Sequence, residues 1–282
     1  MPGILYVIAT PIGNLEDITL RALRLLKEAD LVAAEDTRHS RKLFNHFGIT
    51  TPLTSYFEHN ELRKGEQLVE MLCRGKTLAL ISDAGTPGIS DPGYHLVRRC
   101  HESGIKVVAV PGPSAVIAAL SISGLPLEGF TFAGFLPAKG RARREALQAV
   151  GGERRTVVLY EAPHRLLATL RRLAGAYGPE REVAVARELT KIHEEFFRGT
   201  LGEALAHFAA KGVKGEIVLL LAPATAEGEA KPTETTAQAL ARWRQQAPEL
   251  SRRELAKRVA KELGMGVSEV YNESLKIVRS EE

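Results

Sequence analysis

Short apolar segments alternate with helical patterns along the first half of the chain. Leu20, Leu23 and Leu26 recur at the spacing of a helical turn, which predicts a helix over 19–27. Continuous apolar segments predict buried strands at 4–9, 31–34, 77–81 and 107–110. Strands that are apolar on both faces and separated by helices are typical of a parallel sheet covered on each side. The first half is therefore expected to be an α/β domain.

The second half has a different pattern, because several of its strands follow one another without a helix between them. Strands are expected at 130–135, 156–160, 182–188, 194–199 and 216–222. Helices are expected at 141–150, 163–175 and 201–209. This order predicts an α+β domain with a mixed sheet. With a Gly- and Pro-rich boundary at 124–129, the predicted units are 1–124, 125–224 and an extension at 225–282.

The extension is predicted to be a linker followed by helices. Residues 223–234 have the Ala-, Glu-, Thr- and Pro-rich composition that is typical of a linker. Ser251 is expected to cap a helix, with Glu254 at the matching position of a capping box. The apolar stripe of that helix consists of Leu255, Val259 and Leu263. A further helix is expected at 267–278.

Composition narrows the class of protein. Hydrophobic residues make up 44% and charged residues 26% of the 282 positions, the usual balance of a globular protein. The two cysteines form no C-x-x-C pattern, which argues against a disulfide framework and a thiolate zinc site. We see no basic and apolar leader, and no apolar stretch approaches the roughly 18–20 residues that span a bilayer. A cytoplasmic protein with no membrane segment is expected.

Positive charge is concentrated in one stretch of the second half. The whole chain has a net charge of +4, whereas residues 137–172 alone hold nine Lys or Arg against three Glu. A local excess of this kind can attract a polyanion such as a nucleic acid. The alternative is an ordinary solvated basic face.

Three loops rich in Gly, Pro and other small residues follow three of the predicted strands, at 9–17, 82–93 and 110–115. Small residues let a ligand approach the backbone, and proline fixes the shape of a loop. Each loop alone could be a simple turn. Because the carboxyl ends of parallel strands meet at one edge of a sheet, the three together predict a shared ligand pocket.

The common nucleotide and metal motifs are missing. The sequence has no G-x-x-x-x-G-K-[ST] and no G-x-G-x-x-G after the first strand, which disfavours a P-loop NTPase and a Rossmann-type enzyme. It has no H-E-x-x-H and no Cys/His cluster, so no metal site is expected.

Five motifs in order resemble a known family. They are YVIATPIGNL at 6–15, AEDTR at 34–38, SDAGTPGISDPG at 82–93, VPGPSA at 110–115 and YEAPHR at 160–165. The chain resembles the ribosomal RNA small subunit methyltransferase I family, of the tetrapyrrole-methylase fold group, from about residue 4 to residue 222. The resemblance implies a two-domain α/β fold with a cofactor cleft between the domains, in a homodimer.

The resemblance also implies the cofactor, S-adenosylmethionine, and the residues that bind it. In the first domain these are Thr10, Pro11, Asp83, Ala84, Gly85, Ile89, Ser114 and Ala115. In the second domain they are Tyr160, Glu216 and Ile217. Asp83 comes first in its loop, whereas the Asp of the fold group's Gly-Gly-Asp loop comes last, so the role of Asp83 is open.

The implied reaction is 2′-O-methylation of a cytidine, cytidine 1402 by the resemblance, in 16S rRNA of the 30S ribosomal subunit. A sulfonium methyl group is already electrophilic, so the protein must chiefly align the 2′-oxygen with it. A base could accept the hydroxyl proton. The candidates are Asp36, Glu161, Glu188 and Lys191, the last only if its pKa is lowered. For Asp36, a structural ion pair with Arg38 is as good an interpretation.

RNA contacts are expected from basic residues near the cleft: Arg38, Arg41, Lys42, Lys139, Arg141, Arg143, Arg144, His164 and Arg165. The C-terminal helices could present one basic face to RNA or pack on the main body. Two other functions stay open. One is methylation of a tetrapyrrole or corrinoid, and the other is a non-catalytic RNA-binding role in ribosome assembly.

Overall fold

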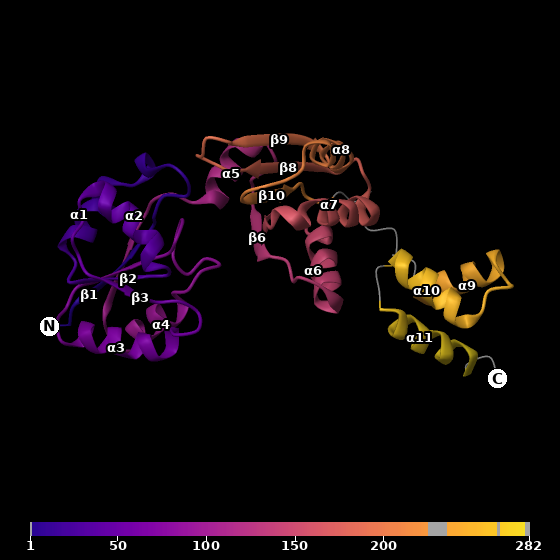
Figure 1. Cartoon of the computed structure of the whole chain (residues 1–282), viewed down its shortest axis with the longest axis horizontal. Coiled ribbons are helices and arrows are strands. Elements are labelled where there is room, and N and C mark those ends of the chain that lie inside the picture. Colours follow the sequence, from indigo (N-terminus) through magenta and orange to yellow (C-terminus); the bar gives the residue numbers. More distant parts are fainter. Residues whose placement is uncertain (1, 225–235, 264–265, 280–282) are drawn as a thin grey trace.

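A computed structural model describes residues 2–224, 236–263 and 266–279. It contains two five-stranded sheets and a cluster of three C-terminal helices (Figure 1). The first sheet holds the N-terminal strands and the second the strands after residue 130. The predicted linker lies almost entirely outside the described residues.

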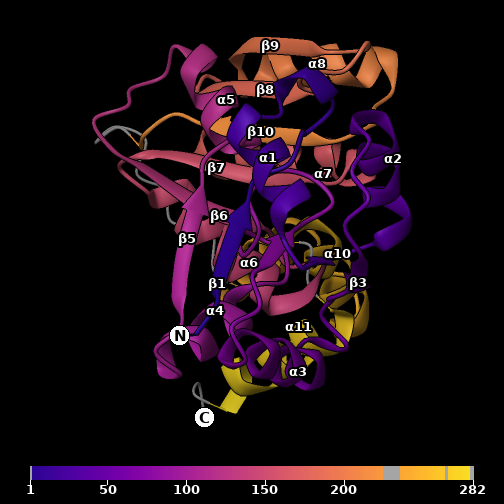
Figure 2. The same cartoon turned by 90° about the vertical axis from the view of Figure 1, so that its left-hand side faces the viewer.

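All strands of the first sheet are parallel, in the order β3-β2-β4-β1-β5. The strands are β1 (Ile4–Ile8), β2 (Leu31–Ala34), β3 (Leu53–Ser55), β4 (Leu78–Ile81) and β5 (Lys106–Val110). Viewed from the side of this sheet, β1 and β5 run next to each other (Figure 2). The sequence predicts four of these strands. It misses β3, whose three residues are too short for a recognisable apolar segment.

Both faces of this sheet are covered, which explains its continuous apolar strands. Along β4, Leu78 and Leu80 belong to one core, whereas Ala79 and Ile81 belong to the core on the opposite face. Helices α1 and α2 contribute to the second of these cores, and α3 and α4 to the first. The helices are α1 (Leu20–Glu28), α2 (Thr37–Phe47), α3 (Glu61–Cys73) and α4 (Tyr94–Glu102), with a short 3-10 turn at Leu15–Asp17.

The second sheet is mixed, as the sequence predicts, in the order β6-β7-β10-β8-β9. Its strands are β6 (Phe130–Phe135), β7 (Thr156–Glu161), β8 (Glu182–Arg187), β9 (Glu195–Thr200) and β10 (Ile217–Leu221). Only the β6–β7 pair is parallel. One face packs against α6 (Gly140–Gly152), α7 (Pro163–Tyr177) and α8 (Leu201–Lys211).

Helix α5 (Ala115–Ser123) covers the opposite face of the second sheet. Its residues Val116, Ala119 and Leu120 share a core with Val158 and Leu220. The sequence-based boundary at residue 124 assigns this helix to the first domain, whereas its packing groups it with the second. Helix α5 therefore begins directly at the junction of the two sheets.

The C-terminal helices have a core of their own. They are α9 (Thr236–Gln246), α10 (Arg252–Leu263) and α11 (Val267–Arg279). The expected capping box is present, since Ser251 N–H donates to Glu254 at 2.9 Å and Glu254 N–H donates to Ser251 Oγ at 3.4 Å. Leu255 and Val259 are buried against α9 and α11. The sequence misses α9.

Candidate active site

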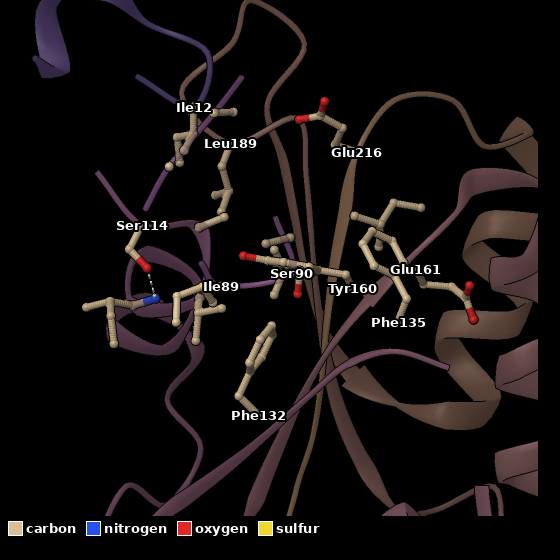
Figure 3. Close-up of a pocket in the computed structure, with 18 of the residues that line it drawn as sticks. Ile12, Ile89, Ser90, Ser114, Phe132, Phe135, Tyr160, Glu161, Leu189 and Glu216 are labelled. Atoms are coloured by element: carbon tan, nitrogen blue, oxygen red, sulfur yellow. Dashed lines mark hydrogen bonds between the residues drawn. The ribbon is translucent and has the colours of Figure 1, made fainter. Parts of the chain in front are cut away.

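A cavity of about 610 Å³ lies between the two sheets. The second loop contributes residues 84–86 and 89–91, and the start of α5 contributes residues 114–117. Its other wall comes from the second sheet, with Phe132, Phe135, Tyr160, Leu189 and Glu216 (Figure 3). A cavity of this volume, mostly apolar with a few polar groups, is typical of a small-molecule site.

The first and second loops are joined by their backbones. Thr10 N–H donates to Gly85 O and Gly85 N–H donates to Thr10 O, both at 2.9 Å. Thr10 Oγ1 also donates to the carbonyl of Ser82. Gly85 has a φ of +76°, a conformation that favours glycine. Because β1 and β4 are neighbours, this bridge forms at the carboxyl end of the sheet, where ligands bind in open α/β folds.

The third loop starts helix α5. Ser114 is the N-cap, and its hydroxyl accepts a hydrogen bond from Ile117 N–H at 3.5 Å (Figure 3). Ala115 follows at the cavity wall. The cap places the first turn of α5 against the cavity, with only a methyl side chain at residue 115.

Aromatic rings form the wall on the second sheet. The Tyr160 ring lies 5.1 Å from that of Phe132 and 5.3 Å from that of Phe135, centroid to centroid. Figure 3 shows the Tyr160 hydroxyl directed toward Ile89 and Ser90 of the other domain. Burial raises the pKa of Tyr160, and the charges of Asp91 and Glu216 add to this effect. The phenol therefore stays protonated and can donate a hydrogen bond.

The structure brings most of the predicted cofactor residues to this cavity. Its wall includes Ala84, Gly85, Ile89, Ser114, Ala115, Tyr160, Glu216 and Ile217. Three predicted residues lie outside its lining: Thr10, Pro11 and Asp83. Thr10 is buried behind Gly85. The Asp83 carboxylate accepts from Asp36 N–H at 3.0 Å, so it fixes the loop after β2 to the loop after β4.

Asp36 caps a helix and pairs with a neighbouring arginine. It is the N-cap of α2, accepts from Arg38 N–H at 2.8 Å and forms an ion pair with the Arg38 side chain at 2.9 Å. Hydrogen bonds from Arg38 lower the pKa of Asp36 to about 2. A carboxylate with so low a pKa accepts protons weakly, and Asp36 is not in the cavity wall.

Glu161 borders the cavity, but its carboxylate is buried on the other side of β7. It accepts a hydrogen bond from Thr169 and forms ion pairs with Arg165 at 3.1 Å and Arg143 at 3.8 Å. Figure 3 shows it turned away from Ile89 and Ser90. Its three partners hold it in a buried polar cluster.

Glu188 and Lys191 form an ion cluster with Glu216 at the rim of the cavity. Lys191 Nζ lies 2.8 Å from Glu188 and 3.0 Å from Glu216. Burial opposes the charge of Lys191, but the hydrogen bonds that it donates to both glutamates outweigh this effect and raise its pKa. The condition under which Lys191 could act as a base, a lowered pKa, is not met. The hydrogen bond from Lys191 also lowers the pKa of Glu188.

Some of the predicted RNA-binding residues are exposed to solvent and others are not. Arg38, Arg41 and Lys42 are exposed on α2, and His164 is exposed at the start of α7. Arg141 is exposed and forms an ion pair with Glu145 at 2.6 Å.

Two predicted RNA-binding residues are structural instead. Arg143 is buried and donates to Thr169 and to the carbonyl of Pro137. Arg165 donates to the carbonyl of Leu136 at 2.6 Å and pairs with Glu161. Their charges are used inside the second domain, so the basic stretch presents less positive charge to a polyanion than its sequence suggests.

Sequence reasoning missed several residues of the cavity. Phe132 and Phe135 lie in a predicted strand that carries no functional motif, and no motif marks Leu189. Asp91 lies near the end of the 82–93 motif, and the sequence alone does not indicate a function for it. Burial raises the pKa of Asp91 to about 6, and the charge of Glu35 adds to this effect.

The sequence matches known proteins along most of its length. The profile of Tetrapyrrole (Corrin/Porphyrin) Methylases matches residues 4–205. A Synechocystis sp. protein named Ribosomal RNA small subunit methyltransferase I is 55% identical over 80% of this chain and 81% of its own. An Escherichia coli O157:H7 protein of the same name is 50% identical over 82% of each chain. The chain belongs to the ribosomal RNA small subunit methyltransferase I family.

One member of the family is shorter. The Thermotoga maritima relative is 49% identical over 78% of this chain, and that match covers 98% of its own length. Almost the whole of that relative therefore corresponds to about four-fifths of this chain.

Solved structures show the same fold. Uroporphyrin-III-C-methyltransferase from Thermus thermophilus has 22% identity and a TM-score of 0.57 over 78% of this chain and 94% of that one. A diphthine synthase has 14% identity and a TM-score of 0.62 over 80% of this chain and 93% of that one. The predicted α/β fold of the tetrapyrrole methylases is confirmed. In the described part of the chain, no helix has the length and apolar character to cross a membrane.

Proposed function

We propose that the protein transfers a methyl group from S-adenosylmethionine to the 2′-oxygen of a cytidine in 16S rRNA of the small ribosomal subunit. The observation that carries this proposal is 50–55% identity, over about four-fifths of the chain, to proteins named Ribosomal RNA small subunit methyltransferase I. The cavity between the sheets is the proposed site of transfer.

The cavity residues fit this cofactor. Phe132, Phe135 and Tyr160 offer flat apolar surface for a purine ring, and Ala84 and Ala115 add no bulk beyond a methyl group. The carboxylate of Glu216 complements the positive charge of the cofactor. When bound, the cofactor supplies a methyl group that is already electrophilic.

The protein's own part is to position the reacting groups and exclude water. The backbone bridge between Thr10 and Gly85 and the N-cap of α5 fix the cavity wall before a ligand enters. Such alignment can supply about 7–11 kcal/mol of the barrier at best. Thr10 and Asp83 support the wall from behind, whereas Ile89, Ser114 and Ile217 contact the cofactor.

The RNA approaches over exposed basic residues of both domains. Arg38, Arg41 and Lys42 on α2 and His164 on α7 are the proposed phosphate contacts. Phosphate contacts supply affinity without choosing a sequence, so selection of one cytidine needs a base removed from its stack.

A homodimer in the cytoplasm completes the proposal. Large apolar side chains outside the cavity lining are exposed on α5 and the segment that follows it: Ile122 and Leu127. Contiguous exposed apolar surface marks interaction sites in globular proteins. A second copy of the chain is the proposed partner on this surface.

Methyl incorporation tests the function. The purified protein should transfer labelled methyl groups from S-adenosylmethionine to 30S particles or 16S rRNA, and not to a corrinoid. Incorporation into the corrinoid alone would favour the tetrapyrrole alternative. RNA binding with no methyl transfer to any ribosomal substrate would favour the assembly role.

A further inference from the structure

Asp91 differs from the other carboxylates that line the cavity. Glu161 is held by Arg143 and Arg165, and Glu216 is paired with Lys191. For Asp91, no ion pair with a basic residue occurs within residues 2–224, 236–263 and 266–279. It is therefore the cavity carboxylate whose charge is left for a ligand.

Asp91 also lies where two cavities meet. Together with Ser90, it lines both the 610 Å³ cavity and an adjacent cavity of about 320 Å³. The remaining wall of the smaller cavity comes from Glu58, Glu61, Pro92, Gly93, Tyr94 and His95. A ligand group in the smaller cavity can therefore reach Asp91, and at this side chain it also reaches the larger cavity.

The backbone before Asp91 is in an uncommon conformation. Ser90 has a φ of +65°, in the left-handed region that residues other than glycine seldom adopt. Its hydroxyl lies close to Gly134 of β6, so the second loop extends across to the second domain. A strained residue held by the surrounding structure is typical of functional sites. Here the strain sets the direction of the chain at the residue between the cavities.

The surroundings of Asp91 bring the pKa of its carboxyl group close to neutral pH. The buried carboxyl has the charges of Glu35 and Asp83 nearby, a hydrogen bond from Ser82, and Tyr160 on the opposite domain. Glu58, Glu61 and His95 share the wall of the smaller cavity with it. Burial raises its pKa to about 6, Glu35 and Asp83 add to this effect, and the Ser82 hydrogen bond opposes it. A base is most effective when its pKa is near the working pH.

We infer that Asp91 is the general base of the reaction and that the target ribose approaches it from the smaller cavity. This inference rests on the proposed function. The O–H bond of the 2′-hydroxyl breaks, and its proton passes to a carboxylate oxygen of Asp91. The freed electron pair forms the bond to the methyl carbon, while the electron pair of the carbon–sulfur bond stays with sulfur. Atoms and charges balance without a metal or a further reactant.

The test compares Asp91→Asn and Asp91→Glu with the full-length protein on 30S particles. Asparagine keeps the size of the side chain and removes the base, so the rate at pH 8 should fall roughly 10²–10⁴-fold. The affinity for S-adenosylmethionine, measured by calorimetry, should stay unchanged. Glutamate keeps a carboxylate and should restore part of the rate.

The pH profile separates a base from a structural residue. The wild-type rate should fall about tenfold per pH unit below pH 6, because protonated Asp91 cannot accept a proton. The residual rate of Asp91→Asn should show no such break. A wild-type rate in this variant, a retained break near pH 6, or a parallel loss of cofactor affinity would each overturn the inference.

A second readout does not depend on turnover. In ¹³C NMR of aspartate-labelled protein, one carboxyl signal should titrate near pH 6 and be missing from Asp91→Asn. A signal for Asp91 that titrates near 3.8 would contradict the inference. If the wild-type protein methylates nothing, the proposed function fails, while this titration still reports on the state of Asp91.

Discussion

At the scale of single residues, pairing decides what an ionisable group can do. Glu161, Arg143 and Arg165 are all polar residues of the second domain, but they hold one another in its interior. Among the residues that the structure describes, Asp91 has no basic partner, and it lines a cavity. The same residue types therefore serve structure in one place and chemistry in the other.

Glu161→Gln should lower stability more than it changes chemistry. The substitution leaves the guanidinium groups of Arg143 and Arg165 without their buried carboxylate. Breaking a buried ion pair on one side costs about 3–5 kcal/mol. Urea unfolding followed by circular dichroism should show this loss of unfolding free energy. Glu145→Gln, which removes an exposed partner of Arg141, is the control and should cost less than about 1 kcal/mol.

The sequence predicted small residues of the site better than charged ones. Ala84, Gly85 and Ala115 follow predicted strands, and their position in the chain is enough to place them at the cavity. The buried position of the Arg143 side chain depends on its hydrogen bond to Thr169 and its ion pair with Glu161. These residues lie 26 and 18 positions away on other elements. Such pairing follows from tertiary packing, so no local pattern could reveal it.

At the scale of elements, the first loop lies close to the segment after β8 in the second domain. A Cβ on Gly13 would lie 2.4 Å from Lys191 Cγ, 2.7 Å from Thr190 Oγ1 and 2.9 Å from Leu189 O. Leu189 is also part of the cavity wall. The absence of a side chain at Gly13 lets these segments approach closely.

Gly13→Ala should weaken cofactor binding. The added methyl group forces the two segments apart, and overpacking of this kind costs about 1–3 kcal/mol. If the added methyl group destabilises the arrangement that binds the cofactor by this amount, the affinity for S-adenosylmethionine drops by about 5- to 150-fold. Calorimetry can measure this change. Gly175→Ala is the matched control, because a Cβ there meets nothing within 4 Å. An unchanged affinity in Gly13→Ala would show that the contact does not shape the cavity.

Strand prediction succeeded where apolar segments were long and failed where packing was needed. The buried strand β10 is apolar at all five positions and was readily predicted. The three-residue strand β3 was not. Helix α5 packs on the second sheet although it precedes the sequence-based boundary at residue 124, because its apolar residues do not tell which sheet they cover.

At the scale of the whole molecule, the C-terminal helices form a separate unit. Their described core residues come from α9, α10 and α11, and Leu250 of the segment between α9 and α10 packs against them. On α10 the two glutamates are engaged, Glu254 by Ser251 and Glu262 by Arg242 and Trp243. The exposed face of α10 is therefore basic, with Arg252, Arg253, Lys257 and Lys261.

Removal of residues 225–282 should weaken binding of the ribosomal substrate and leave cofactor affinity unchanged. Filter binding of labelled 30S particles at several salt concentrations measures both affinity and salt dependence. Each phosphate contact that is lost should reduce the slope of log K against log salt by about 0.7–0.9. The triple variant Arg253→Glu, Lys257→Glu and Lys261→Glu tests the same face in the full chain. An affinity and a slope equal to those of the intact protein would assign these helices another role.

The product of the reaction can be identified directly. After reaction with S-adenosylmethionine, 30S particles should be digested and their 16S rRNA fragments mapped by mass spectrometry against a reaction without protein. We expect one new methyl group, on the ribose 2′-oxygen of a single cytidine. A methyl group on a base, on another nucleotide, or on no ribosomal RNA at all would contradict it.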